Sequence, residues 1–174
     1  TSSGKVPISK LSVVIDKETT GYKGGNPVIP TVTVKNGKTK LEVNKDYAVE
    51  YTNNTEVGTG YVVISGMGKY VGTRTDKFAI TGASISKYKA TNIINVVYNG
   101  VAQKQHDYTL KASTKNAIPL TEDKDYSVSY TNNVNVGTAT MNFKGINGYK
   151  GTLKKTYKIV PFFSYNSILL FSFF

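Results

Sequence analysis

The chain has 174 residues, of which 39% are hydrophobic and 19% are charged, and its formal net charge is +11. This length allows one large or two small domains, and the composition is typical of a folded chain. Cysteine and tryptophan are absent and histidine occurs once. These absences exclude disulfides and thiolate metal sites and leave few groups for acid–base catalysis near neutral pH. We therefore expect no enzymatic activity, no cofactor and no metal site.

The positive charge comes almost entirely from lysine, because Arg74 is the only arginine. A basic chain attracts polyanions, so an anionic cell-wall polymer or a glycan is a candidate partner, beside the simpler interpretation of a solvated surface. Lysine lacks the bidentate geometry with which arginine reads guanine. We therefore expect no sequence-specific binding of nucleic acid.

An internal repeat organises the chain. Residues 45–80 and 124–159 align without a gap and are identical at 16 of 36 positions. Shorter matches lie upstream, and the second copy carries about three extra residues between Lys111 and Asp125. The repeat predicts two modules, residues 1–82 and 83–160, arranged end to end and joined by a short linker of small residues. Residues 161–174 form an apolar tail outside the repeat.

Apolar residues alternate within each copy, which predicts β-strands. In chain order, the positions expected to face inward are Val32, Val34, Tyr47, Val49, Tyr51, Val62, Ile64, Phe78 and Ile80, matched by Tyr108, Leu110, Tyr126, Val128, Tyr130, Met141, Phe143, Tyr157 and Ile159. Between them, Tyr61 and Val63 are replaced by Thr140 and Asn142, so these variable positions are expected to face water. No segment has a sustained helical period, which nearly excludes helix.

Turn residues recur at matched places. Paired asparagines at 53–54 and 132–133 fit the left-handed conformation of hairpin turns. Glycines recur at 58, 66 and 72 and at 137, 145 and 151, where we expect positive φ angles or close backbone contacts. Short strands and frequent turns predict an all-β chain of two tandem, small, antiparallel β-sandwiches. The thirteen tyrosines supply large side chains for such small cores.

The repeated residues form the pattern D-Y-x-V-x-Y-x-N-N-x-x-x-G-T-x-x-x-x-x-x-G-x-x-x-Y-x-G-T, which ends in aromatic-x-Ile. This pattern resembles the tandem bacterial Ig-like repeats, including the MBG type, of Gram-positive surface proteins. The resemblance implies a secreted or cell-wall-attached parent protein in which such modules act as stalks, spacers or adhesive domains. The chain contains neither a signal peptide nor a wall-sorting motif, so we expect it to be a fragment of that parent.

The tail contains five of the seven phenylalanines and no charged residue. Three interpretations stay open: a strand that docks on this chain or on a neighbour, an artefact of expression or read-through, and a segment that touches a membrane. The candidate docking residues are Phe162, Phe163, Ile168 and Leu170. Strand donation by the tail would make the protein a fibre or phage component.

Two groups of residues invite a chemical interpretation. His106 and Asp107 form the only histidine–carboxylate pair, but catalysis also needs a nucleophile and a pocket, so we expect an exposed pair. The second group, Glu122, Asp123 and Asp125, offers oxygen ligands for calcium, although a turn before the following strand is the simpler interpretation.

The resemblance also raises a Lys–Asn isopeptide cross-link, which requires a buried acid. The positions predicted to face inward contain no lysine and no acid, so we expect no such link.

Glycan binding is the main alternative to a structural role. The candidate aromatic contacts are Tyr61 in the first copy and Tyr88, Tyr98 and Tyr108, which we expect to crowd one part of the second. The sequence therefore predicts a non-enzymatic extracellular structural or adhesive module, with a carbohydrate-binding or host-adhesion module as the alternative.

Overall fold

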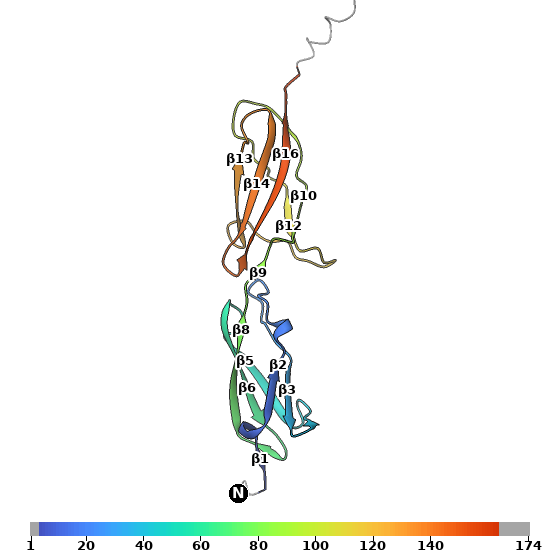
Figure 1. Ribbon diagram of the computed structural model, residues 1–174, viewed down its shortest axis with the longest axis vertical. Helices are drawn as coiled ribbons and strands as arrows, with labels where there is room; N and C mark the ends of the chain where they lie inside the picture. Colours follow the sequence, from blue (N-terminus) through green and yellow to red (C-terminus); the bar gives the residue numbers. More distant parts are fainter. Residues whose placement is uncertain (1–3, 164–174) are drawn as a thin grey trace, which may run out of the picture. The chain divides into compact units, whose positions relative to one another are not determined.

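A computed structural model describes residues 4–163, and these residues form an all-β structure with 49% strand (Figure 1). The chain divides into two compact units between Ala83 and Ser84. Two single-turn 3-10 helices, η1 (Ile8–Lys10) and η2 (Lys17–Thr19), are the only helical elements in the described part. The expectation that helix is nearly absent is therefore confirmed.

The first unit contains two antiparallel three-stranded sheets and one short parallel pair. One sheet consists of β2 (Ser12–Ile15), β3 (Val32–Asn36) and β4 (Thr39–Lys40), and the other of β5 (Tyr47–Thr52), β6 (Gly58–Gly66) and β8 (Thr73–Ile80). The pair is β1 (Val6–Pro7) with β7 (Tyr70–Val71). Both sheets contribute to one buried cluster, in which Val34 from β3 packs with Tyr47, Val62 and Ile64. This arrangement is consistent with a β-sandwich.

The second unit repeats most of these elements. Its larger sheet has the order β11 (Val96–Val97), β16 (Thr152–Val160), β14 (Gly137–Gly145) and β13 (Tyr126–Thr131), with β11 parallel to β16. The smaller sheet pairs β10 (Lys89–Thr91) with β12 (Thr109–Lys111), and β9 (Ala83–Ser84) pairs with β15 (Tyr149–Lys150). Its core contains Leu110, Met141, Phe143, Tyr157 and Ile159.

The predicted inward positions are confirmed in both units. All are buried or pack as partly buried side chains against the cores. The alternation also holds at the variable positions: Tyr61 is exposed, whereas Val63, Thr140 and Asn142 are half-buried rather than fully in water. The period of two therefore identified which face of each strand lies inside.

The repeated turn residues adopt the expected backbone conformations. Asn53 and Asn132 have φ angles of 50° and 55°. A Cβ atom on Gly66 or Gly145 would lie 2.6 Å from the backbone nitrogen of Val71 or Lys150, so only glycine fits there. The other four matched glycines, at 58, 72, 137 and 151, have positive φ angles.

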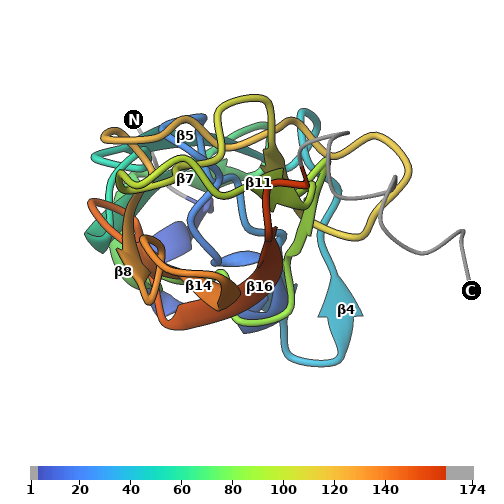
Figure 2. The same cartoon turned by 90° about the horizontal axis from the view of Figure 1, so that it is seen from above.

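The two units differ most after β3 and β12. Leu41 N–H donates to the carbonyl of Val34 (2.9 Å), and Leu120 N–H donates to that of Leu110 (2.8 Å), so the second unit has three more residues between matched positions. This confirms the predicted insertion. In the first unit the shorter connection is the β3–β4 hairpin, which projects clearly in Figure 2. The second unit has no strand in the corresponding segment, residues 112–119.

Candidate functional site

The Asp-Tyr pair of each repeat closes the turn that precedes β5 or β13. Asp46 accepts a hydrogen bond from Glu42 N–H (3.0 Å), and Asp125 accepts one from Thr121 N–H (2.8 Å). Inside these turns Asn44 and Asp123 both have a φ angle of 64°. The predicted turn is therefore confirmed, and the Asp125 carboxylate holds it together.

In the first unit, three side chains of β5 and its following turn hold the segment that leads into β3, including the first residue of that strand. Tyr47 donates to the carbonyl of Val32 (3.0 Å), Tyr51 to that of Pro30 (2.6 Å), and the Asn54 amide to that of Val28 (3.1 Å). The acceptors are alternate residues, as in a strand pair, but side chains supply the donors. Val28 N–H in turn donates to the backbone carbonyl of Asn54 (2.7 Å). We call this set the side-chain ladder.

The second unit contains the same side-chain ladder with different acceptors. Tyr130 both donates to the carbonyl of Gln105 and accepts from its N–H, at 3.2 Å each. The Asn133 amide donates to Gln103 (2.9 Å), which also accepts from Tyr157 (2.6 Å). Tyr126 donates to the Tyr108 hydroxyl (3.3 Å). The shared Tyr and Asn side chains are therefore occupied by bonds within each unit.

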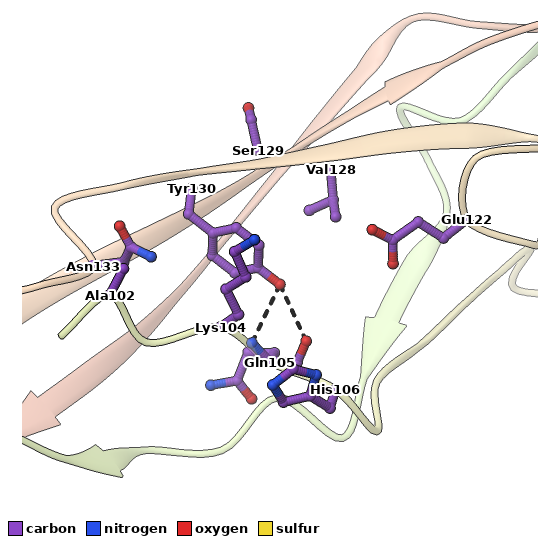
Figure 3. A pocket seen from close by; sticks show the side chains of 9 residues that line it. All are labelled: Ala102, Lys104, Gln105, His106, Glu122, Val128, Ser129, Tyr130 and Asn133. Atoms are coloured by element: carbon purple, nitrogen blue, oxygen red, sulfur yellow. Dashed lines mark hydrogen bonds between the residues drawn. The ribbon is translucent and has the colours of Figure 1, made fainter. Parts of the chain in front are cut away.

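An open hollow of about 420 Å³ lies beside β13 in the second unit (Figure 3). Gln105 lines it and is buried. Tyr130 holds its backbone, and its side-chain amide donates to the carbonyl of Ile94 and accepts from the N–H of Ile94. Lys104 and His106 flank Gln105 on the rim, and Glu122 lies on the opposite wall. The hollow thus gathers the one histidine, a lysine and a carboxylate.

The geometry of the hollow does not assemble a catalytic group. Ser129 is the one hydroxyl nucleophile on its wall besides Tyr130, and Figure 3 shows it pointing to the far side of β13 from His106. Glu122 accepts a 2.5 Å hydrogen bond from the hydroxyl of Tyr108. The pKa of Tyr108 is raised, mainly because the ring is buried and secondly because of this hydrogen bond to a carboxylate. His106 and Asp107 are both exposed, as the sequence predicted. A nucleophile, its base and an orienting group are therefore not aligned here.

The predicted calcium ligands do not gather into a site. Asp125 caps its own turn, and Glu122 is bonded to Tyr108. Among residues 4–163, no three histidine or acidic side chains lie close enough together to hold a metal ion.

No lysine or acid is fully buried among the described residues, where Thr20 and Gln105 are the buried polar side chains. The half-buried pair of Arg74 with Asp76 is joined at 2.7 Å. A buried Lys–Asn–acid arrangement is thus not found in the described part of the chain.

The four tyrosines proposed as glycan contacts have different surroundings. Tyr61 and Tyr98 are 36% and 38% exposed. Tyr88 packs edge-on against Tyr149, with ring centroids 6.4 Å apart, and Tyr108 packs against Phe143 at 5.6 Å. Tyr61 belongs to the first unit and the other three to the second. A role in glycan binding stays a prediction for all four.

Two of the four docking residues of the tail can be described. Phe162 and Phe163 are 71% and 80% exposed, so neither ring is covered by the residues that the structure describes. Ile168 and Leu170 lie outside the described residues. Strand donation stays a prediction.

One further surface depends on strand register and is not among the sites that the sequence predicts. The outward residues of β13, β14 and β16 that are paired across these strands lie side by side and form one face, whereas the exposed Val160 lies beyond the last pair of β14 with β16. The members of this hydroxyl–lysine face are Ser127, Ser129, Thr131, Thr138, Thr140, Asn142, Lys144, Thr152, Lys154, Thr156 and Lys158. Its signal in the sequence is a run of Ser, Thr, Asn and Lys at every second position of three strands.

Comparison with protein-family models and with curated proteins gives no match for this chain. Within residues 4–163, no helix has the length and apolar character needed to cross a membrane.

Proposed function

We propose that the chain consists of two tandem Ig-like modules that serve as a non-catalytic spacer in an extracellular bacterial surface protein. This proposal rests on the hydrogen bonds that the repeated side chains make within their own unit. The motif side chains Asp46, Tyr47, Tyr51 and Asn54, like their counterparts, bond to the backbone or to side chains of their own unit. Folding thus accounts for these shared Asp, Tyr and Asn side chains, which are the most distinctive residues of the repeated pattern.

The path of the chain through each unit supports a load-bearing role. Figure 1 shows the chain entering the first unit beside β1 and leaving at the opposite end of that unit after β8. β8 is antiparallel to β6 over eight residue pairs, and β16 to β14 over eight. Hydrogen bonds between antiparallel strands are perpendicular to the strands, so a pull along the last strand loads many bonds at once. Bonds that share a load resist it better than bonds broken one at a time.

Single-molecule pulling of the full chain, attached through its two ends, tests this proposal. We expect two separate unfolding events, each releasing roughly 25 nm of chain, because about 75 residues at roughly 3.4 Å each become extended. The variant Tyr51→Phe/Asn54→Ala should lower the force of one event only, which assigns that event to the first unit. Unfolding without measurable resistance would contradict the spacer role.

A glycan array probed at low and at physiological salt separates the spacer from the adhesive alternative. If the chain binds one uncharged glycan even at physiological salt, and Tyr61→Ala or Tyr98→Ala abolishes this binding, the chain is a carbohydrate-binding module and not a spacer. The spacer proposal expects no such capture, because the motif tyrosines are occupied within the fold.

A further inference from the structure

The hydroxyl–lysine face is polar and free of carboxylates. Register places its members in rows across three strands: Ser127, Lys144 and Thr152 in one row, and Ser129, Asn142 and Lys154 in the next. Thr131, Thr140 and Thr156 form a third row, and Thr138 with Lys158 a fourth. The three lysines are exposed, and no acidic side chain interrupts the rows.

The matched face of the first unit provides an internal comparison on the same scaffold. Its outward residues are Ala48, Glu50, Thr52, Thr59, Tyr61, Val63, Ser65, Thr73, Thr75, Lys77 and Ala79. That face has one acid and one lysine, so its net charge is zero, whereas the face of the second unit has three lysines and a net charge of +3. The fold therefore does not require lysines at these positions.

The lysines of the face lie along a line and lack acidic partners. Lys154 and Lys158 are four residues apart on β16, or about 13 Å at the rise of an extended strand. Lys144 lies on the neighbouring strand, opposite Thr152, and continues the line. Lys158 donates to the hydroxyl of Thr138 (2.6 Å), which fixes one end of it. Both ion pairs found among residues 4–163 belong to the first unit.

We propose that the hydroxyl–lysine face binds an anionic polymer of phosphodiester-linked polyols, laid across β14 and β16. Lysine ammonium groups act as point charges for phosphate groups that recur along a flexible chain. The Ser, Thr and Asn side chains between them offer donors and acceptors to the hydroxyl groups of the polyol units. This binding is an additional property of the second unit and does not depend on the spacer role.

The composition of the face favours this polymer over a nucleic acid. Single-stranded nucleic acid is bound largely by stacking of bases on aromatic rings. The aromatic residue of the first unit's face, Tyr61, is Thr140 in the second, and none of the eleven members is aromatic. The face also has no arginine, which is the residue that reads base edges bidentately. The hydroxyl–lysine face therefore suits a polymer whose negative charges are separated by hydroxyl groups.

Fluorescence anisotropy with a labelled glycerol-phosphate polymer, between about 50 and 200 mM salt, tests the proposal. The variant Lys144→Gln/Lys154→Gln/Lys158→Gln should bind at least about tenfold more weakly at the lower salt concentration. The slope of log affinity against log salt should fall by about 2, because three fewer counterions are displaced. The control Lys89→Gln/Lys104→Gln/Lys115→Gln removes the same charge from exposed positions elsewhere on the second unit, and should change affinity by less than about threefold.

A gain of binding provides an independent test on the first unit. Glu50→Ser/Ser65→Lys/Thr75→Lys/Ala79→Lys transfers the charged positions to the matched face, and should raise the number of chains bound per polymer or the overall affinity. Thermal unfolding of each variant verifies that the fold is retained.

Three outcomes would overturn the proposal. Equal losses in the two triple variants would mean that net charge alone attracts the polymer. Equal affinity for single-stranded DNA of the same charge would remove the preference for polyol units. Absence of binding at the lower salt concentration would exclude the surface altogether. The pulling experiment is unaffected by all three, so failure here is distinguishable from failure of the spacer role.

Discussion

The two units anchor the same segment with the same side chains but fill the space behind it differently. In the first unit, Tyr47 bonds to the backbone of Val32 beside aliphatic neighbours. In the second, Tyr126 meets Tyr108 and Phe143 in a cluster of three rings, with centroid distances of 5.6 to 6.5 Å. A scaffold of matched hydrogen bonds thus tolerates two kinds of core.

The outer faces differ more than the interiors. Thr140 replaces Tyr61, and Lys158 replaces Ala79, at positions where the register is unchanged. Because the fold accepts either residue set, the outer faces are where the two units acquire separate properties. Each unit can therefore serve as the control for the other.

The largest expected difference is in alkaline stability. Burial, as the first cause, raises the pKa of Tyr47 and Tyr51 in the first unit. In the second unit, burial is likewise the first cause that raises the pKa of five tyrosines: Tyr88, Tyr108, Tyr126, Tyr130 and Tyr157. A tyrosine whose pKa is raised by folding stabilises its unit fully below the unfolded pKa of about 10. This contribution is lost as the pH rises from that value through the pKa of the folded state. Each such tyrosine adds a slope of at most about 1.4 kcal/mol per pH unit.

We therefore expect the second unit to unfold first as the pH rises above about 10. Tyrosine absorbance, combined with hydrogen exchange resolved by unit, measures this order. Loss of the first unit before the second, or of both at one pH, would contradict the assignment of the buried tyrosines.

The next largest effect is a loss of stability at two matched glycines, Gly66 and Gly145, where the two units have the same structure. Gly66→Ala and Gly145→Ala each place a methyl group against backbone atoms at 2.6 Å, which cannot move aside as a side chain can. We expect each to destabilise its own unit by about 3 kcal/mol, measured by urea unfolding. Gly25→Ala is the control: its Cβ would have no neighbour within 4 Å, so only the cost of its positive φ angle should remain. A large loss in one unit alone would show that the two turns are not equivalent.

A smaller effect separates the two side-chain ladders. Tyr130→Phe leaves both the N–H and the carbonyl of buried Gln105 without their partner, and should cost about 2 kcal/mol. Tyr51→Phe removes a partner from the carbonyl of Pro30 alone, because proline has no N–H, and should cost about 1 kcal/mol. Chemical denaturation of the two variants measures the difference. Equal costs would mean that the bond to Gln105 N–H contributes nothing.

The smallest effect concerns the turn before β15. Asn147 has a φ angle of 49° and donates to the carbonyl of Lys124 (2.6 Å), where the first unit has Gly68 with a φ angle of 61°. Asn147→Gly exchanges a hydrogen bond for relief of backbone strain, so we expect a change within about 0.5 kcal/mol. Asn147→Ala loses the bond without that relief and should cost about 1 kcal/mol or more. A shift in melting temperature for Ala but not for Gly is the expected result.

The sequence predicted the strands because alternation and repetition support each other. Tyr47 and Tyr126, for example, are apolar-face residues in both copies, and both are 3% exposed. The side-chain ladder was not predictable in the same way, because its acceptors are carbonyl groups that any residue carries. Val28 and Gln103 occupy equivalent places through their bonds to Asn54 and Asn133 and share no side-chain chemistry.

The candidate sites were predictable only in part. Exposure of His106 and Asp107 followed from the lack of a counterpart in the first repeat. The hollow beside them is formed by Gln105, Glu122 and β13, which are separated along the chain. The hydroxyl–lysine face required the register of three strands, and a shift by one residue would have placed its lysines inside.

The motif residues shared by the repeats serve the fold, whereas the outer lysines do not, and hydrogen-exchange mass spectrometry on the full chain carrying Asn54→Ala and Asn133→Ala tests this most directly. We expect both units to lose about 1 kcal/mol of opening free energy or more, while the triple lysine-to-glutamine variant of the hydroxyl–lysine face exchanges like the unmodified chain. Unchanged protection in either unit of the asparagine variant, or lost protection in the lysine variant, would contradict it.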